Sequence, residues 1–400
     1  MSGRGAALPD GAVLVHIGPP KTGTTALQMA LHERRRDLAE HGVLYPGPTH
    51  RQKRPGFALT GQKYHGKSIP MSVWDTLAGS VRNSADQRVC ISTENLARAQ
   101  RSHIAKLVSD LGEERVHMIL TARRLDRLLP SAWQQRVKVK ETLAYGPWLA
   151  RVLDPDGDNP RSRVFWKHHA LEDLITDWLE FLPADRITVI VADESDRTQQ
   201  LRTFEDLLAL PKGILDADDH LGGRSSNTSL SYDRAELLRR FNAMVSGIDG
   251  GRATHRLEMA LRRSVYRAPR EPWEVRIPPL PGWAAERVST LSKDRAESVH
   301  NSGVRIIGDP EALLFNPGDQ PEDLPPAPES VPISVTLATL AEAFRHADAA
   351  ENRTKPGPAP VTRPARAAVA DTSSKRLLGE VVRRQRSRLR PGRRGAADAG

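Results

Sequence analysis

The stretch AVLVHIGPPKTGTTALQMAL, residues 12–31, decides the fold. Its first six residues are an apolar run of strand length, and Gly18, Pro19 and Pro20 then force a tight turn. A helix begins within Lys21–Thr25, and its apolar positions form a stripe that can pack against a sheet. The stretch therefore predicts a buried strand, a turn and a covering helix, as in a parallel α/β protein.

The turn residues of this stretch are suited to holding an anion. Gly23, Thr24 and Thr25 present backbone amides and hydroxyls at a helix N-terminus, where the helix dipole favours negative charge. Lys21 adds a positive charge at the same place, whereas a plain helix cap would need no Lys there. The order differs from the common phosphate loop G-x-x-x-x-G-K-[ST], because Lys21 precedes Gly23 by two residues. We expect a phosphate-like ligand on a different kind of loop.

The order Lys-Thr-Gly-Thr-Thr after a first strand resembles the 5′-phosphosulfate loop of sulfotransferases that use PAPS (3′-phosphoadenosine 5′-phosphosulfate). The longer string HIGPPKTGTT is similar to bacterial and heparan-type members, and the resemblance covers roughly residues 12–309. It implies that Lys21 binds the bridging oxygen and stabilises the leaving phosphate. It also implies that the phosphosulfate is cradled by Thr22, Gly23, Thr24 and Thr25.

The apolar runs along the chain predict one sheet with helices between its strands. They lie at residues 12–17, 42–46, 88–92, 116–121, 187–192 and 304–307. Short buried runs separated by helical stretches are typical of parallel βαβ units. The predicted fold is therefore α/β, a P-loop NTPase-like three-layer sandwich with a roughly five-stranded parallel sheet. We expect this domain to span 1–315, followed by a Pro-rich linker with a short docking helix (316–350) and a disordered basic tail (351–400).

Composition limits the compartment and the partners. The chain has one cysteine, Cys90, which excludes an internal disulfide and fits a reducing compartment. Its N-terminus lacks a signal-peptide pattern, and no apolar run approaches the roughly 20 residues of a spanning helix. We expect a soluble cytoplasmic protein.

The net charge is concentrated at the C-terminus. Residues 351–400 hold 13 Lys or Arg against 4 Asp or Glu, so the tail accounts for +9 of the net charge of +10. The body is nearly neutral, and no specific nucleic-acid partner is expected. The tail is either solvated or a segment that contacts an anionic membrane or other acidic surface.

A second candidate anion site is the pair Arg123 and Ser131. Arg123 follows a buried strand, and Ser131 is predicted to open the next helix eight residues later. Taken alone, an Arg on nearby carbonyls and a Ser capping a helix would explain both residues. Their spacing is similar to the 3′-phosphate-binding element of the sulfotransferase family, which implies that they hold the 3′-phosphate. Arg124 is expected to face solvent or Asp126.

Glu94 is the candidate general base, because it follows the strand RVCIS and should lie at the same sheet edge as Lys21. The plain alternative is a first-turn acid favoured by the helix dipole. His16, on the first strand, is the competing base. Arg224 begins a polar run that resembles the loop closing over the 3′-phosphate in many sulfotransferases, although it lacks the usual Arg-Lys-Gly triplet. The plain alternative for this run is a loop that caps the next helix.

The sequence therefore predicts sulfuryl transfer from PAPS to a hydroxyl or amine, with PAP (3′-phosphoadenosine 5′-phosphate) as the other product. By family likeness the acceptor is a small molecule or glycan, including glycolipids and secondary metabolites. No metal is expected, because the chain has no Cys/His cluster. The alternatives are a P-loop small-molecule kinase, which would require a Gly-Lys-[Ser/Thr] order, and a non-catalytic sulfotransferase-like binding protein.

Overall fold

The computed structural model describes residues 7–64, 66–154, 157, 159–216, 229–247, 258–262, 264–265, 274–318, 320–331 and 333–354. The chain divides into two compact units, Met1–Phe344 and Arg345–Gly400. The second unit is described only to residue 354, the end of helix α14 (Ile333–Thr354). The predicted short helix is thus present and longer than expected, whereas residues 355–400 of the predicted tail lie outside the described ranges.

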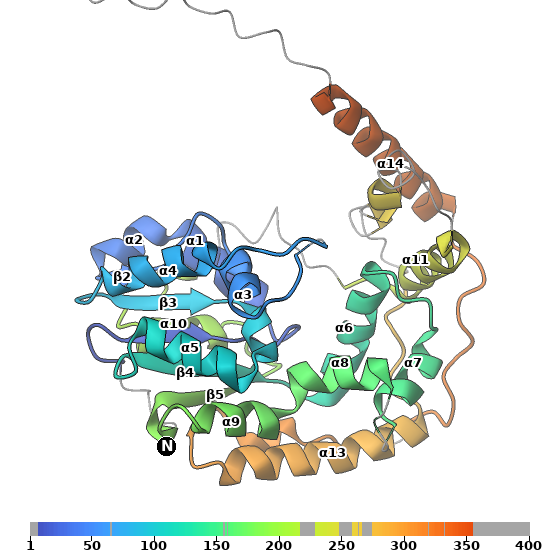
Figure 1. Cartoon of the computed structure of the whole chain (residues 1–400). Helices are drawn as coiled ribbons and strands as arrows, with labels where there is room; N and C mark the ends of the chain where they lie inside the picture. Colours follow the sequence, from blue (N-terminus) through green and yellow to red (C-terminus); the bar gives the residue numbers. More distant parts are fainter. Residues whose placement is uncertain are drawn as a thin grey trace, which may run out of the picture. The chain divides into compact units, whose positions relative to one another are not determined.

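Within the described residues, six parallel strands form one sheet in the order β2-β3-β1-β4-β5-β6. Figure 1 labels four of them, β2, β3, β4 and β5. The strands are β1 (Val13–His16), β2 (Val43–Leu44), β3 (Arg88–Ser92), β4 (Val116–Ala122), β5 (Ile187–Val191) and β6 (Arg305–Ile307). The prediction of about five strands was one short. The edge strands β2 and β6 have only two and three residues, and both lie within apolar runs named from the sequence, 42–46 and 304–307, so all six runs join the sheet.

The parallel register brings distant parts of the chain to one edge of the sheet. β1 pairs with β3 on one side and with β4 on the other, so that His16 lies opposite Ser92 and Ile119. β4 in turn pairs with β5. Because all these strands run in the same direction, the segments that follow β1, β3, β4 and β5 leave at the same edge, which is where open α/β sheets bind ligands.

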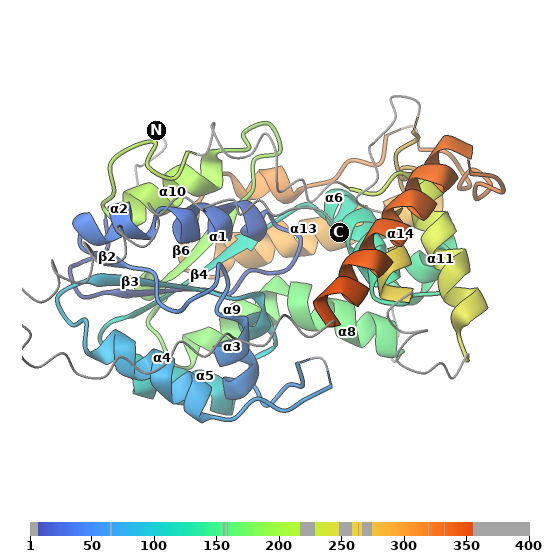
Figure 2. The same cartoon turned by 90° about the horizontal axis from the view of Figure 1, so that it is seen from above.

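Helices cover both faces of this sheet. Alternate residues of β1 divide between the faces: Val13 and Val15 contact one helical layer, and Leu14 contacts the other. Figure 2 shows α1, α2 and α10 on one side of the sheet and α3, α4, α5 and α9 on the other. Their bounds are α1 (Thr24–Glu33), α2 (Arg35–Glu40), α3 (Lys53–Leu59), α4 (Ser72–Arg82), α5 (Arg101–Leu111), α9 (Leu171–Leu179) and α10 (Gln199–Leu207). Three short 3-10 turns are η1 (Glu94–Arg98), η2 (Ala184–Arg186) and η3 (Pro310–Leu313).

A second apolar core lies among helices beyond the sheet. These helices are α6 (Leu125–Lys138), α7 (Tyr145–Val152), α8 (Pro160–His169), α11 (Tyr232–Val245) and α13 (Gly282–Asn301). The rings of Trp133 and Tyr145 pack at its centre, with centroids 5.2 Å apart. Helix α13 joins the two cores, because Val288 belongs to the helical core and Val299 to the sheet core.

The helix that follows β4 begins earlier than predicted. Ser131 lies inside α6, which starts at Leu125, and Pro130 is accommodated within the helix. A proline at this position removes one backbone hydrogen bond without ending the helix. None of the helices in the described ranges combines the length and the apolarity that a bilayer-spanning segment needs.

Candidate active site

The turn between β1 and α1 has the backbone of an anion-binding loop. Lys21 and Gly23 both have positive φ, at 73° and 90°, and α1 begins directly afterwards at Thr24. No side chain caps this helix, so its first-turn amides can bind an external anion. Gly18 also has a positive φ, and a Cβ added there would lie 3.2 Å from Cγ of Glu94. The loop therefore requires glycine where it passes the end of β3.

One cavity of about 420 Å³ brings together most of the predicted site residues. The predicted residues that line it are Lys21, Gly23, Thr24, Thr25, Glu94, Arg123 and Ser131. Gln135 and Ser229 also line it, from α6 and from the start of the segment before α11. Arg224 lies outside the described residues. The volume is within the range of about 300–1,000 Å³ that small-molecule sites usually have.

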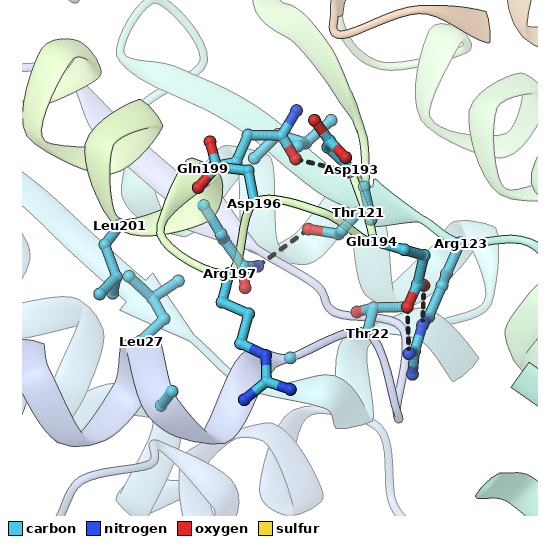
Figure 3. A pocket seen from close by; sticks show the side chains of 15 residues that line it. Thr22, Leu27, Thr121, Arg123, Asp193, Glu194, Asp196, Arg197, Gln199 and Leu201 are labelled. Atoms are coloured by element: carbon cyan, nitrogen blue, oxygen red, sulfur yellow. Dashed lines mark hydrogen bonds and ion pairs between the residues drawn. The ribbon is translucent and has the colours of Figure 1, made fainter. Parts of the chain in front are cut away.

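Thr22 is placed differently from its neighbours. Its hydroxyl is buried and donates to the carbonyl of Pro19 at 2.7 Å. Thr22 lines an adjoining cavity of about 340 Å³ between the loop and the segment after β5, which Figure 3 shows. Its side chain thus stabilises the turn, and only its backbone is free to take part in anion binding.

Glu94 lies beside the loop because β3 is the neighbour of β1. Its carboxylate accepts a 2.6 Å hydrogen bond from the hydroxyl of Thr24, the first residue of α1. Glu94 lines both the 420 Å³ cavity and a second one of about 540 Å³. A carboxylate at this junction could accept a proton from a molecule in the second cavity while the first cavity is filled.

His16, the competing base, is completely buried and lines neither cavity. Its Nδ1 lies 2.8 Å from the hydroxyl of Ser92, and its ring packs edge-on against Phe204. Burial lowers the pKa of His16 to about 4, although the charge of Glu94 opposes this shift. The geometry therefore favours Glu94 over His16 as a group that can reach a substrate.

Arg123 contacts the loop and a carboxylate at once. Its Nη1 donates to the carbonyl of Lys21 at 3.0 Å. Its Nε and Nη2 donate to the two carboxylate oxygens of Glu194 at 2.5 and 2.8 Å (Figure 3). The hydrogen bond from Arg123 lowers the pKa of Glu194. The two N–H donors of Arg123 that would suit a phosphate, Nε and Nη2, thus bind a carboxylate in this structure.

The backbone of Arg123 is itself anchored by a buried guanidinium. Arg295, on α13, donates from Nη2 to the carbonyl of Arg123 at 3.4 Å and from Nη1 to the carbonyl of His169. Burial lowers the pKa of Arg295 to about 10, so it is charged at neutral pH. Arg124, as predicted, pairs with Asp126 through two hydrogen bonds of 2.9 and 2.8 Å.

The 420 Å³ cavity is strongly basic although the body of the protein is nearly neutral. Among the described residues its lining holds four cations, Lys21, Arg51, Lys53 and Arg123, against the single carboxylate of Glu94. Burial, and then the charge of Arg123, lowers the pKa of Lys21. Burial and the charge of Lys21 lower the pKa of Lys138, on α6, to about 8. A bound anion would relieve this crowding of positive charge.

Three residues of this site were missed by the sequence analysis. Arg51 donates to the hydroxyl of Thr25 at 3.0 Å, and Lys53 follows it at the start of α3. Both lie in a polar stretch without periodicity, which gives no sign of where the chain returns to the loop. Glu194 could have been found, because it follows β5 as Glu94 follows β3 and Arg123 follows β4.

The described residues contain no group of three or more His, Cys, Asp or Glu placed to hold a metal ion.

These features define a parallel α/β protein with a basic cavity at the carboxyl edge of its sheet. No protein-family model matches the chain, and no curated protein matches it. Among solved structures, the chain is similar to the crystal structure of a sulfotransferase from Alicyclobacillus acidocaldarius. The identity is 15%, the TM-score is 0.33, and the match covers 52% of this chain and 83% of that chain. A likeness of this extent assigns no function to this chain.

Proposed function

We propose that this protein is a PAPS-dependent sulfotransferase. The observation that carries the proposal is the meeting of four cations, an uncapped helix N-terminus and one carboxylate around a single cavity. The donor has a phosphosulfate and a separate 3′-phosphate. The cations come from three separate places: Lys21 from the loop, Arg51 and Lys53 from the chain leading into α3, and Arg123 from the end of β4.

In this proposal the loop binds the 5′-phosphosulfate. Lys21 contacts the bridging oxygen, Gly23, Thr24 and Thr25 supply amides at the start of α1, and Thr25 also supplies its hydroxyl. The hydroxyl of Thr24 already donates to Glu94, so Thr24 contributes its backbone. Thr22 contributes only its backbone, because its hydroxyl is bonded to Pro19. The fold in this proposal is of the P-loop type, with the Lys placed before the Gly.

The 3′-phosphate is assigned to Arg123 and Ser131, with Arg224 as a further contact. Ser131 lies in the second turn of α6, so its hydroxyl rather than a helix-end amide would contact the phosphate. Arg123 must release Glu194 or share its donors with the incoming phosphate. The binding of PAPS therefore includes a change in this ion pair.

The proposed reaction is a direct transfer at sulfur. The acceptor oxygen attacks the sulfur, the bond between sulfur and the bridging oxygen breaks, and the products are a sulfate ester and PAP. Glu94 accepts the proton of the acceptor hydroxyl, and Lys21 stabilises the negative charge that develops on the leaving phosphate. The chemistry depends mainly on positioning and charge stabilisation, as in phosphoryl transfer.

The remaining parts of the proposal concern surroundings and partners. PAPS serves as the only cofactor, without a metal, and the acceptor is a small molecule or glycan. We place the reaction in the cytoplasm. The basic C-terminal segment is either solvated or contacts an anionic membrane or other acidic surface, without specific nucleic-acid binding.

A second candidate function is small-molecule phosphorylation, which one contact favours. In P-loop kinases the loop Ser or Thr and a carboxylate from a neighbouring strand end hold Mg²⁺. The 2.6 Å hydrogen bond between Thr24 and Glu94 places the same two groups together. The loop order argues against this candidate, because it lacks the Gly-Lys-[Ser/Thr] sequence.

Calorimetric titration of PAP, ADP and ATP, with and without Mg²⁺, distinguishes the two candidates. A sulfotransferase binds PAP more tightly than ADP without Mg²⁺. Glu94→Gln does not weaken this binding, because the amide oxygen can still accept the hydrogen bond from Thr24 and a negative charge beside the phosphates is removed. A kinase binds ATP best with Mg²⁺, and Glu94→Gln weakens that binding. Preference for ATP with Mg²⁺ and negligible binding of PAP would refute the proposed function.

A further inference from the structure

A second cavity adjoins the proposed donor site. It measures about 540 Å³ and shares Pro20, Lys53 and Glu94 with the 420 Å³ cavity. A molecule in this second cavity can therefore contact the carboxylate of Glu94 while the donor occupies the first. This is the arrangement that an acceptor needs, because its hydroxyl must meet both the base and the sulfur.

The second cavity carries an excess of positive charge that the donor does not use. Its lining includes Lys63 and Arg98 in addition to the shared Lys53. Within the described part of the chain, none of these three cations forms an ion pair with a carboxylate. Arg98 has instead a 3.5 Å contact from Nη1 to the amide oxygen of Gln62. Burial and the charge of Arg136 lower the pKa of Arg98, so an anion nearby would stabilise its charged form.

The remaining lining provides an apolar wall and neutral polar groups. Phe57 presents a ring that packs against Tyr64, with centroids 5.2 Å apart. Burial, and the charges of Arg98 and Lys167, lower the pKa of His168 to about 4, so His168 is neutral near pH 7. The apolar face of a sugar ring, or an aromatic ring, can pack on Phe57. The amides of Gln62 and Asn95 and the imidazole of His168 can bind the hydroxyls of such a molecule.

We propose that this second cavity is the acceptor site and that it selects acceptors carrying an oxyanion, either a carboxylate or a phosphate or sulfate group. Arg98 and Lys63 hold the oxyanion, Phe57 packs against the ring, and the hydroxyl to be sulfated faces Glu94. This inference depends on the proposed function, because it is the donor in the first cavity that makes the second an acceptor site.

The test measures binding of matched acidic and neutral probes to the PAP-saturated protein by ligand-observed NMR. The sugar probes are glucose, glucuronate and glucose 6-phosphate, and the aryl probes are 2-(4-hydroxyphenyl)ethanol and 4-hydroxyphenylacetate. We expect the acid of at least one scaffold to bind about tenfold more tightly than its neutral partner, as a few partly exposed charge contacts allow. The two acidic sugars distinguish a carboxylate site from a phosphate or sulfate site.

Two variants test whether Arg98 and Lys63 cause the preference for acidic probes. Arg98→Gln and Lys63→Gln should each reduce the preference for the acid at least threefold, because each removes one partly exposed charge contact. Both variants should leave PAP affinity unchanged. Arg36→Gln on α2 and Lys293→Gln on α13 remove exposed cations elsewhere and should change neither quantity. Thermal unfolding of each variant verifies that it is folded.

Equal binding of acid and neutral probes, no binding of any probe, or a preference that survives both variants would overturn the inference. These failures are separable from failure of the proposed function. If PAP binds and no acid preference appears, only the acceptor class is wrong. If PAP itself does not bind, the donor assignment is wrong.

Discussion

Neutralising Glu194 should strengthen binding of the nucleotide product PAP. In the free protein, the carboxylate of Glu194 holds Nε and Nη2 of Arg123 at 2.5 and 2.8 Å. A 3′-phosphate assigned to Arg123 competes for the same donors. Glu194→Gln keeps the size of the side chain and removes its charge, so the fork of Arg123 is released more easily.

The magnitude follows from the exposure of the pair. The side chains of Arg123 and Glu194 are 26% and 33% exposed, so the ion pair contributes about 1 kcal/mol at most. Repulsion between the Glu194 carboxylate and a phosphate about 5 Å away adds about 1 kcal/mol at the dielectric constant of water. Removing both terms should tighten PAP binding about fivefold to thirtyfold.

The assay is calorimetric titration of PAP into the protein and into two variants. Glu180→Gln is the matched control. Glu180 also forms a partly exposed ion pair with an arginine, in which its Oε1 lies 2.6 Å from Nη1 of Arg101, but on another surface of the protein. The control should leave PAP affinity unchanged. Unchanged or weaker PAP binding by Glu194→Gln would refute the reasoning, because Glu194 would then orient Arg123 instead of competing with the phosphate.

Three further changes test the loop, the charge of the site and the anchor of Arg123. Gly23→Ala should lower the free energy of unfolding by about 1–2 kcal/mol because the backbone φ of residue 23 is positive. It should also weaken PAP binding, because the new Cβ meets the side chain of Gln200. The control Gly61→Ala also has a positive φ but open space around it, so it should affect only unfolding. PAP affinity should fall from pH 7 to pH 9, because Lys138 has a pKa of about 8 and loses its positive charge over this range. Calorimetry of Lys138→Met should show a smaller change of PAP affinity with pH. Arg295→Met should lower the free energy of unfolding in urea by about 1–3 kcal/mol, because a buried carbonyl of His169 and a partly buried carbonyl of Arg123 lose their donor, and it should also weaken PAP binding.

The sequence was informative wherever chemistry follows directly from a strand end. In a parallel sheet, the residues after neighbouring strands must meet at one edge, and Lys21, Glu94 and Arg123 line one cavity for this reason. The α/β class and the helices on both faces follow from the same alternation of buried runs and helical stretches. The roles of these residues remain predictions.

The sequence was less informative about contacts between distant side chains. Arg51 reaches the loop from a stretch without periodicity. Glu194 follows a predicted strand, but its pairing with Arg123 depends on β4 and β5 being neighbours, which no local pattern gives. The start of α6 was predicted too late because Pro130 resembles a helix beginning when only local sequence is considered. The second cavity, which we propose as the acceptor site, is lined by segments around Lys53, Arg98 and His168, and only the folded chain brings these segments together.

The central claim is that one cavity binds two separate phosphate groups of one nucleotide. Comparing PAP with AMP tests it most directly, because AMP lacks only the 3′-phosphate. Calorimetry of both ligands is required for the unmodified protein, Arg123→Ala, Ser131→Ala and Lys21→Ala. The proposal predicts that the unmodified protein binds PAP at least tenfold more tightly than AMP, in line with an Arg–phosphate contact. It also predicts that Arg123→Ala and Ser131→Ala reduce this preference, whereas Lys21→Ala weakens both ligands. Equal affinities for PAP and AMP in the unmodified protein would contradict the two-phosphate site.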